Sequence, residues 1–396
     1  MMYRKVLRNG MTVVLKEREN GVVCVAFAVR FGAINETLDN KGIAHFIEHM
    51  LYKGTPSRDA RKISMEIERN GGELNGFTSE QITAFWCKMP SKHVDVALDV
   101  LSDMVKNPLF DEKELNKERE VIFQEMKLYQ DNPRYHVLNK IKSLLYKQPF
   151  GAPIIGSKKS MNSNSRIRLK EMFDEVYNPK NMILCVVGDA NFEKLCDFAE
   201  KNFTNVGMKV KYPPIKTSSG SKIEKRKSID QANLVFAYHI PKPDNKLYYA
   251  AYVLNMLMAG GMSSRLFSEI REKRNLAYAV KGSTSNEKDY SFNQIYVGTT
   301  PQSVQKVKSL ILEEFKKVNK NLDLDELNQV KEQITGNYLI SQEDSQEVMM
   351  NLLGYEISGN AKDMEKFIEN IKNVKLSDVK KLAKIKKYSF FALVPE

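Results

Sequence analysis

The sequence lacks a long apolar run. The longest uninterrupted one, Val22–Val29, is far shorter than the roughly 20 residues that cross a bilayer, which excludes a transmembrane helix. The amino terminus has no apolar stretch followed by a small-residue cleavage site, so we also expect no secretory signal. We therefore predict a protein with no membrane partner.

Cysteine is scarce and unpaired. The chain has four cysteines, none of them in a CxxC pair, and each stands alone in an apolar segment. This usage favours buried free thiols in a reducing compartment, so we predict a cytoplasmic protein. The four are Cys24, Cys87, Cys185 and Cys196.

Clusters of like charge are also missing. The 61 Lys and Arg exceed the 49 Asp and Glu, which gives a formal net charge of +12. The basic residues are interspersed with acids, as in Lys117–Glu120, and only Lys222–Lys227 approaches a basic run. We therefore predict no nucleic-acid partner, because such binding needs basic side chains on one face. With 42% hydrophobic and 28% charged residues, the composition is that of a globular protein and excludes disordered and fibrous chains.

The length of 396 residues suggests two domains. Between them, Met208–Ile229 breaks the periodic pattern with Tyr212-Pro213-Pro214 and Ser218–Ser221, as an interdomain linker would. We predict a first domain over 1–207, a linker over 208–229 and a second domain over 230–396.

Hydrophobic periodicity predicts the elements of the first half. The predicted strands are 12–15, 23–31, a hairpin over 73–89, and 182–187; helices are predicted from Gly42, near 63–70, within 93–173 and from Phe192. The second half repeats this order, with predicted strands at 233–239, a pair within 277–297, and 389–394.

Two short stretches align between the halves. Glu114-Leu115-Asn116 matches Glu326-Leu327-Asn328 at an offset of 212, and Ser57-Arg58 matches Ser264-Arg265 at an offset of 207. Together with the repeated order of elements, these matches favour an internal duplication. We predict an α+β protein of the sandwich type, with two similar domains that each pack a mixed, mainly antiparallel sheet with helices.

The predicted helix from Gly42 contains an HxxEH motif. His45 and His49 are four residues apart, so both imidazoles project from one face of the helix and can bind one metal ion. Glu48 lies on the flank of that face, where its carboxylate can act as general base on water activated by the metal. The arrangement is HExxH reversed, so we predict one Zn²⁺ per chain.

A third ligand is expected on another element, because catalytic zinc usually takes three protein ligands. The helix predicted around 111–130 offers Glu118 and Glu125, which share a face because they are two turns apart. We predict that Glu125 binds the metal and that Glu118 supports the site from behind. Glu114 can instead be a solvated surface residue.

The alternative interpretation is that these side chains are structural or on a charged surface. The second half argues against it: Tyr252, Asn255 and Met256 stand at the positions of the motif, and Val330 and Asn337 at those of the two glutamates. The candidate ligands are present together in one repeat and absent together in the other. This pattern favours one metal site per chain.

The motif and its surroundings resemble a known family. His45–Thr55 and Glu118–Glu125 are similar to the corresponding segments of the pitrilysin/insulinase family of inverted-motif zinc metallopeptidases, or inverzincins. The spacing of 75 residues between His49 and Glu125 resembles that of the short-chain branch, which includes mitochondrial processing peptidase. The resemblance extends over nearly the whole chain.

The resemblance implies a substrate site. Gly71–Thr78 resembles the family's active-site edge strand, where Asn75, Gly76 and Phe77 would hold an extended peptide. The family usually has Ala at the position of Gly76. Arg271 and Tyr278 resemble the family's Arg/Tyr motif and would bind substrate carbonyls.

The function implied is that of a zinc endopeptidase acting on unfolded or flexible peptides inside a clamshell chamber. Glu48 and Glu118 are the predicted catalytic residues. A homodimer is expected because this one chain carries both motifs, with a heterodimer of related subunits as the alternative. The competing hypothesis is a non-catalytic structural subunit; such relatives usually lose ligands, whereas His45, Glu48, His49 and Glu125 are all present.

Overall fold

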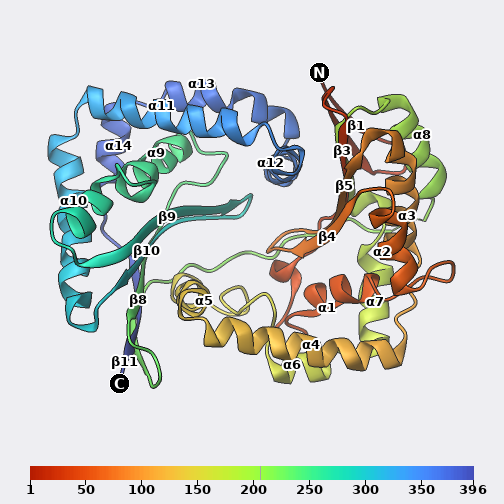
Figure 1. Ribbon diagram of the computed structural model, residues 1–396, viewed down its shortest axis with the longest axis horizontal. Coiled ribbons are helices and arrows are strands. Elements are labelled where there is room, and N and C mark those ends of the chain that lie inside the picture. The colour runs from red at the N-terminus through yellow and green to blue at the C-terminus, as the bar shows by residue number, and fades with distance from the viewer. Residues whose placement is uncertain (206) are drawn as a thin grey trace. The chain divides into compact units, whose positions relative to one another are not determined.

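The apolar runs of the first half form the inner strands of a six-stranded sheet (Figure 1). The computed structural model describes residues 1–205 and 207–396. The strand order is β1-β2-β6-β3-β5-β4, with β2 and β6 parallel and the other neighbours antiparallel. The strands are β1 (Met2–Val6), β2 (Thr12–Glu17), β3 (Val22–Val29), β4 (Glu73–Thr78), β5 (Thr83–Pro90) and β6 (Met182–Gly188).

The second half forms a five-stranded sheet in the order β7-β11-β8-β10-β9, in which β7 and β11 are parallel and the other neighbours antiparallel. Both sheets are therefore mixed and mainly antiparallel, and helices pack on them, which confirms the predicted fold class. The strands are β7 (Ser221–Arg226), β8 (Ala232–His239), β9 (Ala277–Glu287), β10 (Tyr290–Thr299) and β11 (Ser389–Pro395).

Helices cover the sheets. In the first sheet α1 packs on β4 and β5, and α3 packs on β3 and β5; in the second, α9 packs on β9 and β10. The helices are α1 (Ile43–Leu51), α2 (Ala60–Glu68), α3 (Val94–Lys106), α4 (Glu112–Asp131), α5 (Pro133–Leu145), α6 (Lys158–Ser163), α7 (Arg166–Val176), α8 (Phe192–Asn202), α9 (Tyr248–Ala259), α10 (Val304–Asn321), α11 (Leu324–Ser341), α12 (Ser345–Ser358), α13 (Phe367–Lys372) and α14 (Leu376–Leu382).

The two halves of the chain exchange helices. One compact unit consists of Met1–Met126, Ala152–Pro213 and Ser341–Met364, and the other of Lys127–Gly151, Pro214–Ile340 and Glu365–Glu396. Helix α12, from the second half, packs on β3 and β6, and α5, from the first half, packs on β8 and β11. The boundaries of the two duplicated domains, at 207 and 230, stay a prediction.

Both exchanged helices are joined to their sheets by charged groups. Glu356 of α12 is buried and accepts hydrogen bonds from Arg4 of β1 (2.7 and 2.8 Å) and Arg30, which follows β3 (2.7 Å). On α5, His136 Nε2 lies 2.8 Å from Glu224 Oε1 of β7. A buried charge such as that of Glu356 is tolerated only when it is paired in this way, so the two arginines favour the docking of α12 on the first sheet.

Two edge strands differ from the sequence-based expectations. Neither β1 nor β7 was predicted. Strand β7 lies inside the predicted linker, 208–229, so residues Ser221–Arg226 of that segment form a strand. The sequence of β7, SKIEKR, has one apolar residue, Ile223, and that residue is exposed. Charged edge strands lack the apolar alternation by which strands are recognised.

The cysteines and the membrane prediction can be checked directly. All four cysteines are free and buried. Over residues 1–205 and 207–396, no helix combines the length and the apolar character needed to cross a bilayer.

Candidate active site

The helix that carries the HxxEH motif begins at a buried carboxylate. Glu36 accepts hydrogen bonds from the backbone N–H groups of Gly42 (3.0 Å) and Ala44 (2.9 Å), two of the groups that the first turn of α1 leaves unpaired. Gly42 has φ of +91°, and a Cβ atom there would lie 2.6 Å from the carbonyl oxygen of Ile155. Glycine is therefore required where the chain turns into α1.

Three predicted ligands meet at one point. The Nε2 atoms of His45 and His49 each lie 3.6 Å from the same Glu125 oxygen, Oε2. One ligand atom from each of the three residues lies within 4.8 Å of the other two. Over residues 1–205 and 207–396, no other group of three His, Cys, Asp or Glu residues brings its ligand atoms this close together. The three side chains remain 13%, 20% and 26% exposed, so a metal ion and its substrate can reach them.

This geometry fits zinc better than it fits hydrogen bonding. A separation of 3.6 Å is too long for a good N–H···O bond. Tetrahedral zinc, with bonds of about 2.0–2.1 Å, puts neighbouring ligand atoms about 3.4 Å apart. Two imidazoles and a carboxylate are also a usual donor set for catalytic zinc, so the residues present fit the ion.

Glu118 lies behind His49, as predicted. Its Oε2 atom is 3.0 Å from His49 Nδ1, and its Oε1 atom forms an ion pair with Lys53 Nζ at 2.7 Å. Burial would raise the pKa of Glu118, but the hydrogen bonds from His49 and Lys53 hold it below its ordinary value. An ionised Glu118 fixes the imidazole so that Nε2 faces the other ligands.

The two histidines titrate differently in the metal-free protein. Burial, with the charge of His49, lowers the pKa of His45 to about 4. Burial also acts to lower the pKa of His49, but the hydrogen bond to Glu118 and the negative charges of Glu125 and Glu48 outweigh it and raise the pKa to about 9. His45 Nδ1 is buried without a hydrogen-bond partner in the described chain, so only one of the two imidazoles is oriented by a carboxylate.

Glu48, the acid of the motif, is buried. It is 9% exposed, and Thr78 of β4 donates a hydrogen bond to its Oε2 atom at 2.6 Å. Burial raises the pKa of Glu48, with the Thr78 hydrogen bond acting against the shift. A carboxylate with a raised pKa accepts a proton at neutral pH more readily, as a general base requires.

The predicted substrate strand lies beside this base. Strand β4 is the edge of the first sheet and contacts α1. A Cβ atom at Gly76 would lie 3.4 Å from Glu48 Oε1, and Asn75 Oδ1 accepts a hydrogen bond from the Gly76 N–H at 2.8 Å. Phe77 is half-buried in the same strand. Asn75, Gly76 and Phe77 are thus next to the base, while their role in binding stays a prediction.

Arg271 and Tyr278 belong to the second unit. Arg271 lies in a π-helical turn over Phe267–Glu272, with its guanidinium 4.8 Å from the centre of the Phe267 ring. Tyr278, in β9, is 52% exposed, and its hydroxyl lies 3.5 Å from Asn233 Oδ1. Both side chains are accessible, and their predicted contact with substrate carbonyls stays a prediction.

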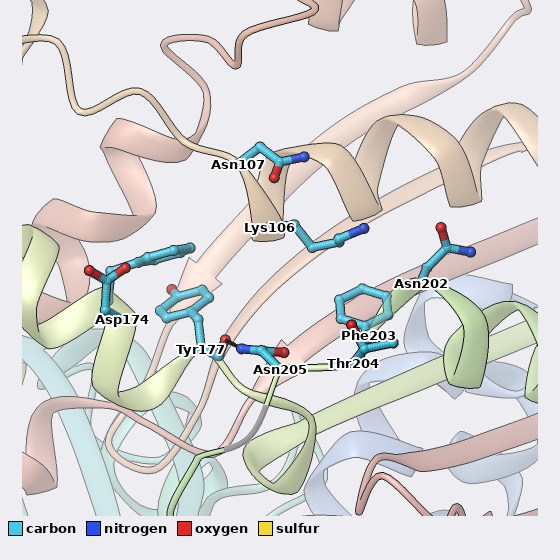
Figure 2. A pocket seen from close by; sticks show the side chains of 9 residues that line it. Lys106, Asn107, Asp174, Tyr177, Asn202, Phe203, Thr204 and Asn205 are labelled. Carbon is cyan, nitrogen blue, oxygen red and sulfur yellow. Dashed lines mark hydrogen bonds between the residues drawn. The ribbon is translucent and has the colours of Figure 1, made fainter.

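A polar pocket in the first unit is separate from the metal ligands. Its volume is about 250 Å³, and Figure 2 shows Lys106 and Asn107 on one side and Asp174, Tyr177 and the segment Asn202–Asn205 on the others. None of the predicted site residues lines it.

Family models match most of the chain. Residues 12–158 match the model described as Insulinase (Peptidase family M16), and residues 165–334 match the one described as Peptidase M16 inactive domain. An uncharacterized zinc protease of Rickettsia felis is 32% identical over 94% of this chain and 92% of its own length. The chain belongs to the M16 (pitrilysin/insulinase) peptidase family.

Further similar proteins match nearly the full length of this chain. The uncharacterized zinc protease YmxG of Bacillus subtilis is 31% identical over 97% of this chain and 95% of its own length. The crystal structure of a protease from Helicobacter pylori has a TM-score of 0.93 at 23% identity and covers all of both chains. A peptidase M16 inactive domain from Pseudomonas fluorescens has a TM-score of 0.90 at 18% identity, covering 100% of this chain and 98% of that one. These structures share the fold.

Sequence reasoning missed two contacts at this M16 site. The hydrogen bond from Thr78 to Glu48 and the ion pair from Lys53 to Glu118 were not predicted. Thr78 and Lys53 both lie in segments that carry the family resemblance, but spacing alone does not indicate which side chain meets the base.

Proposed function

We propose that this protein is a zinc-dependent endopeptidase that hydrolyses unfolded or flexible peptides. The observation that carries the proposal is the convergence of His45 Nε2 and His49 Nε2 on one oxygen of Glu125, with Glu48 beside them on the same helix. The names of the relatives as zinc proteases support it.

The proton steps belong to Glu48. When bound, zinc supplies a Lewis acid that lowers the pKa of water to about 7 and polarises a carbonyl group. Glu48 takes a proton from the attacking water, whose hydroxyl bonds to the carbonyl carbon, and it gives that proton to the amine as the C–N bond breaks. Thr78 donates a hydrogen bond to Oε2 of Glu48, which keeps the carboxylate in one orientation through both proton transfers.

The edge strand β4 supplies the peptide site. An extended peptide can add to this edge as a further strand, with main-chain hydrogen bonds that do not depend on its sequence. The Gly76 N–H is held by its neighbour Asn75, a bond that an incoming peptide carbonyl can replace. This mode of binding selects extended chains, which is why we propose unfolded or flexible substrates.

The second unit would contribute Arg271 and Tyr278 as ligands for substrate carbonyls. Since one chain carries both these residues and the HxxEH motif, we propose a homodimer, with a heterodimer of related subunits as the alternative. Light scattering of this chain purified alone tests the choice: the mass of a dimer supports the homodimer, and the mass of a single chain favours the heterodimer.

A non-catalytic subunit is the second candidate. The model that matches residues 165–334 is described as an inactive domain, and so is the Pseudomonas fluorescens structure. The complete set His45, Glu48, His49 and Glu125 favours the enzyme, because a structural subunit has no need to keep four such residues together.

The test compares the wild type with Glu48→Gln on a quenched-fluorescent peptide library, after both proteins are shown to be folded and to hold equal zinc. Cleavage by the wild type alone supports the proposal. If both proteins are silent while holding zinc, the non-catalytic candidate is favoured.

A further inference from the structure

A buried hydroxyl without a partner lies close to the proposed base. Tyr52 follows the last residue of α1, and its ring packs 5.8 Å from that of Phe85. The Tyr52 hydroxyl oxygen is buried and has no hydrogen-bond partner in the described chain. Burying a hydroxyl without a partner destabilises a protein, so this group calls for an explanation.

The neighbouring glycine leaves room for that hydroxyl. A Cβ atom at Gly76 would overlap the Tyr52 hydroxyl oxygen, and it would lie 2.9 Å from the carbonyl oxygen of Ala84 and 3.4 Å from Glu48 Oε1. Gly76 does not have a positive φ, so its backbone conformation does not require glycine. The Tyr52 hydroxyl therefore stands where the side chain of any other residue at 76 would begin.

The Tyr52 hydroxyl lies on the side of Glu48 that Thr78 does not hold. Thr78 donates to Glu48 Oε2, whereas Oε1 faces Gly76 and so the Tyr52 hydroxyl. A second buried hydroxyl without a partner, that of Tyr177, interacts electrostatically with both Glu48 and Tyr52. Tyr177 also lines the pocket of Figure 2.

We propose that Tyr52 is a positioning residue for Glu48 and that Gly76 is its necessary partner. One buried water accepts a hydrogen bond from the Tyr52 hydroxyl and donates one to Glu48 Oε1. Two such polar partners are enough to hold a buried water. The two carboxylate oxygens are then fixed from opposite sides, Oε2 by Thr78 and Oε1 by Tyr52 through the water. The catalytic meaning of this arrangement rests on the proposed peptidase function; the pairing of Tyr52 with Gly76 does not.

The pairing is tested by stability, which needs no activity. We expect Gly76→Ala to lower the melting temperature by several degrees in the wild type and by clearly less in the Tyr52→Phe background, where the hydroxyl is gone. The contact with Ala84 leaves a residual loss in both backgrounds. Equal losses in the two backgrounds would overturn the pairing, whether or not the protein cleaves peptides.

The positioning role is tested by kinetics and by a crystal structure. We expect Tyr52→Phe to lower kcat about tenfold, with KM and zinc content unchanged, since a hydrogen bond to a charged group is lost. Tyr3→Phe, which removes a hydroxyl from β1, is the matched control and should have wild-type kinetics. An unchanged kcat in Tyr52→Phe, or a high-resolution structure of the zinc-loaded protein with no water bonded to Tyr52, would refute the role. A wild type without activity would instead count against the proposed function.

Discussion

Helix α1, which carries the HxxEH motif, has a counterpart in the second unit, α9. Helix α9 packs on β9 and β10 as α1 packs on β4 and β5, but it has the neutral Asn255 where α1 has Glu48. In the first unit, Thr78 of β4 donates to Glu48 of α1; in the second, Asn255 of α9 donates to Thr284 of β9 at 3.3 Å. Glycine stands beside each group: Gly76 at Glu48, and Gly282, where a Cβ atom would lie 3.1 Å from Asn255 Oδ1. The offset between the helical residues is 207 and that between the strand residues is 206.

The second site is part of a neutral network. Thr284 donates to Asn293 Oδ1 at 2.7 Å, and Asn293 donates to the Tyr238 hydroxyl (3.1 Å) and to the carbonyl of Ala251 (2.8 Å). An amide in this setting needs no counter-charge, whereas Glu48 lies beside two imidazoles. The comparison teaches that the helix-on-hairpin scaffold is shared, and that metal chemistry depends on a few side chains placed on it.

The largest expected effect comes from making the first site resemble the second. Glu48→Gln replaces the base by a neutral amide of the same shape, and we expect kcat/KM to fall by about a thousandfold because no group then accepts the proton. Zinc content, measured by atomic absorption, should stay at the wild-type level. Activity above a tenth of the wild-type value would show that Glu48 is not the base.

The next prediction separates the two glutamates of α4. Glu125→Gln should abolish stoichiometric zinc binding, since a metal ligand is lost, whereas Glu118→Gln should weaken zinc affinity by about 10–100-fold. Competition with a chelator measures both. Glu114→Gln, on the same helix and with its carboxylate paired to Lys117, is the control. Equal losses from Glu125→Gln and Glu118→Gln would contradict the assigned roles.

The reverse substitution tests the second site. Asn255→Asp places a carboxylate at a position that is 4% exposed, with Thr284 as its hydrogen-bonding neighbour and no cation to pair with in the contacts described above. We expect the free energy of unfolding to fall by about 2–4 kcal/mol, measured by urea denaturation, and zinc stoichiometry to remain one per chain. A stable variant that binds a second zinc would show that the two sites differ by less than we infer.

The smallest effect is expected from Tyr278→Phe. Because Tyr278 is 52% exposed, the change should leave the melting temperature and zinc content as they are. If its hydroxyl binds a substrate carbonyl, kcat/KM falls about tenfold, in line with one lost hydrogen bond. Steady-state kinetics on a cleaved library peptide measure this. Unaltered kinetics would show that the Tyr278 hydroxyl does not bind substrate.

The sequence predicted those parts of the molecule that local patterns encode. Apolar runs such as Val22–Val29 and Met182–Gly188 were recognised as strands, and the four-residue spacing of His45 and His49 predicted that they converge. Helical geometry also predicted Glu118 and Glu125 on one face of α4, and the structure brings both to the histidines.

The rest depends on tertiary contacts that spacing does not reveal. Strands β1 and β7 are charged edges whose partners, rather than their own residues, make them strands. The meeting of Tyr52 with Gly76 joins the end of a helix to a strand 24 positions away, and nothing in either segment alone indicates it. The exchange of α5 and α12 was missed because a duplicated sequence favours two contiguous halves.

The exchanged helix α12 has a consequence for synthesis. A chain leaves the ribosome from its amino end, so the strands of the first sheet and all three proposed zinc ligands emerge well before Ser345–Ser358. Until then β3 and β6 lack the helix that covers them, and Arg4 and Arg30 lack Glu356. The unit that holds the proposed zinc site is therefore completed only near the end of translation, when almost the whole chain has been made.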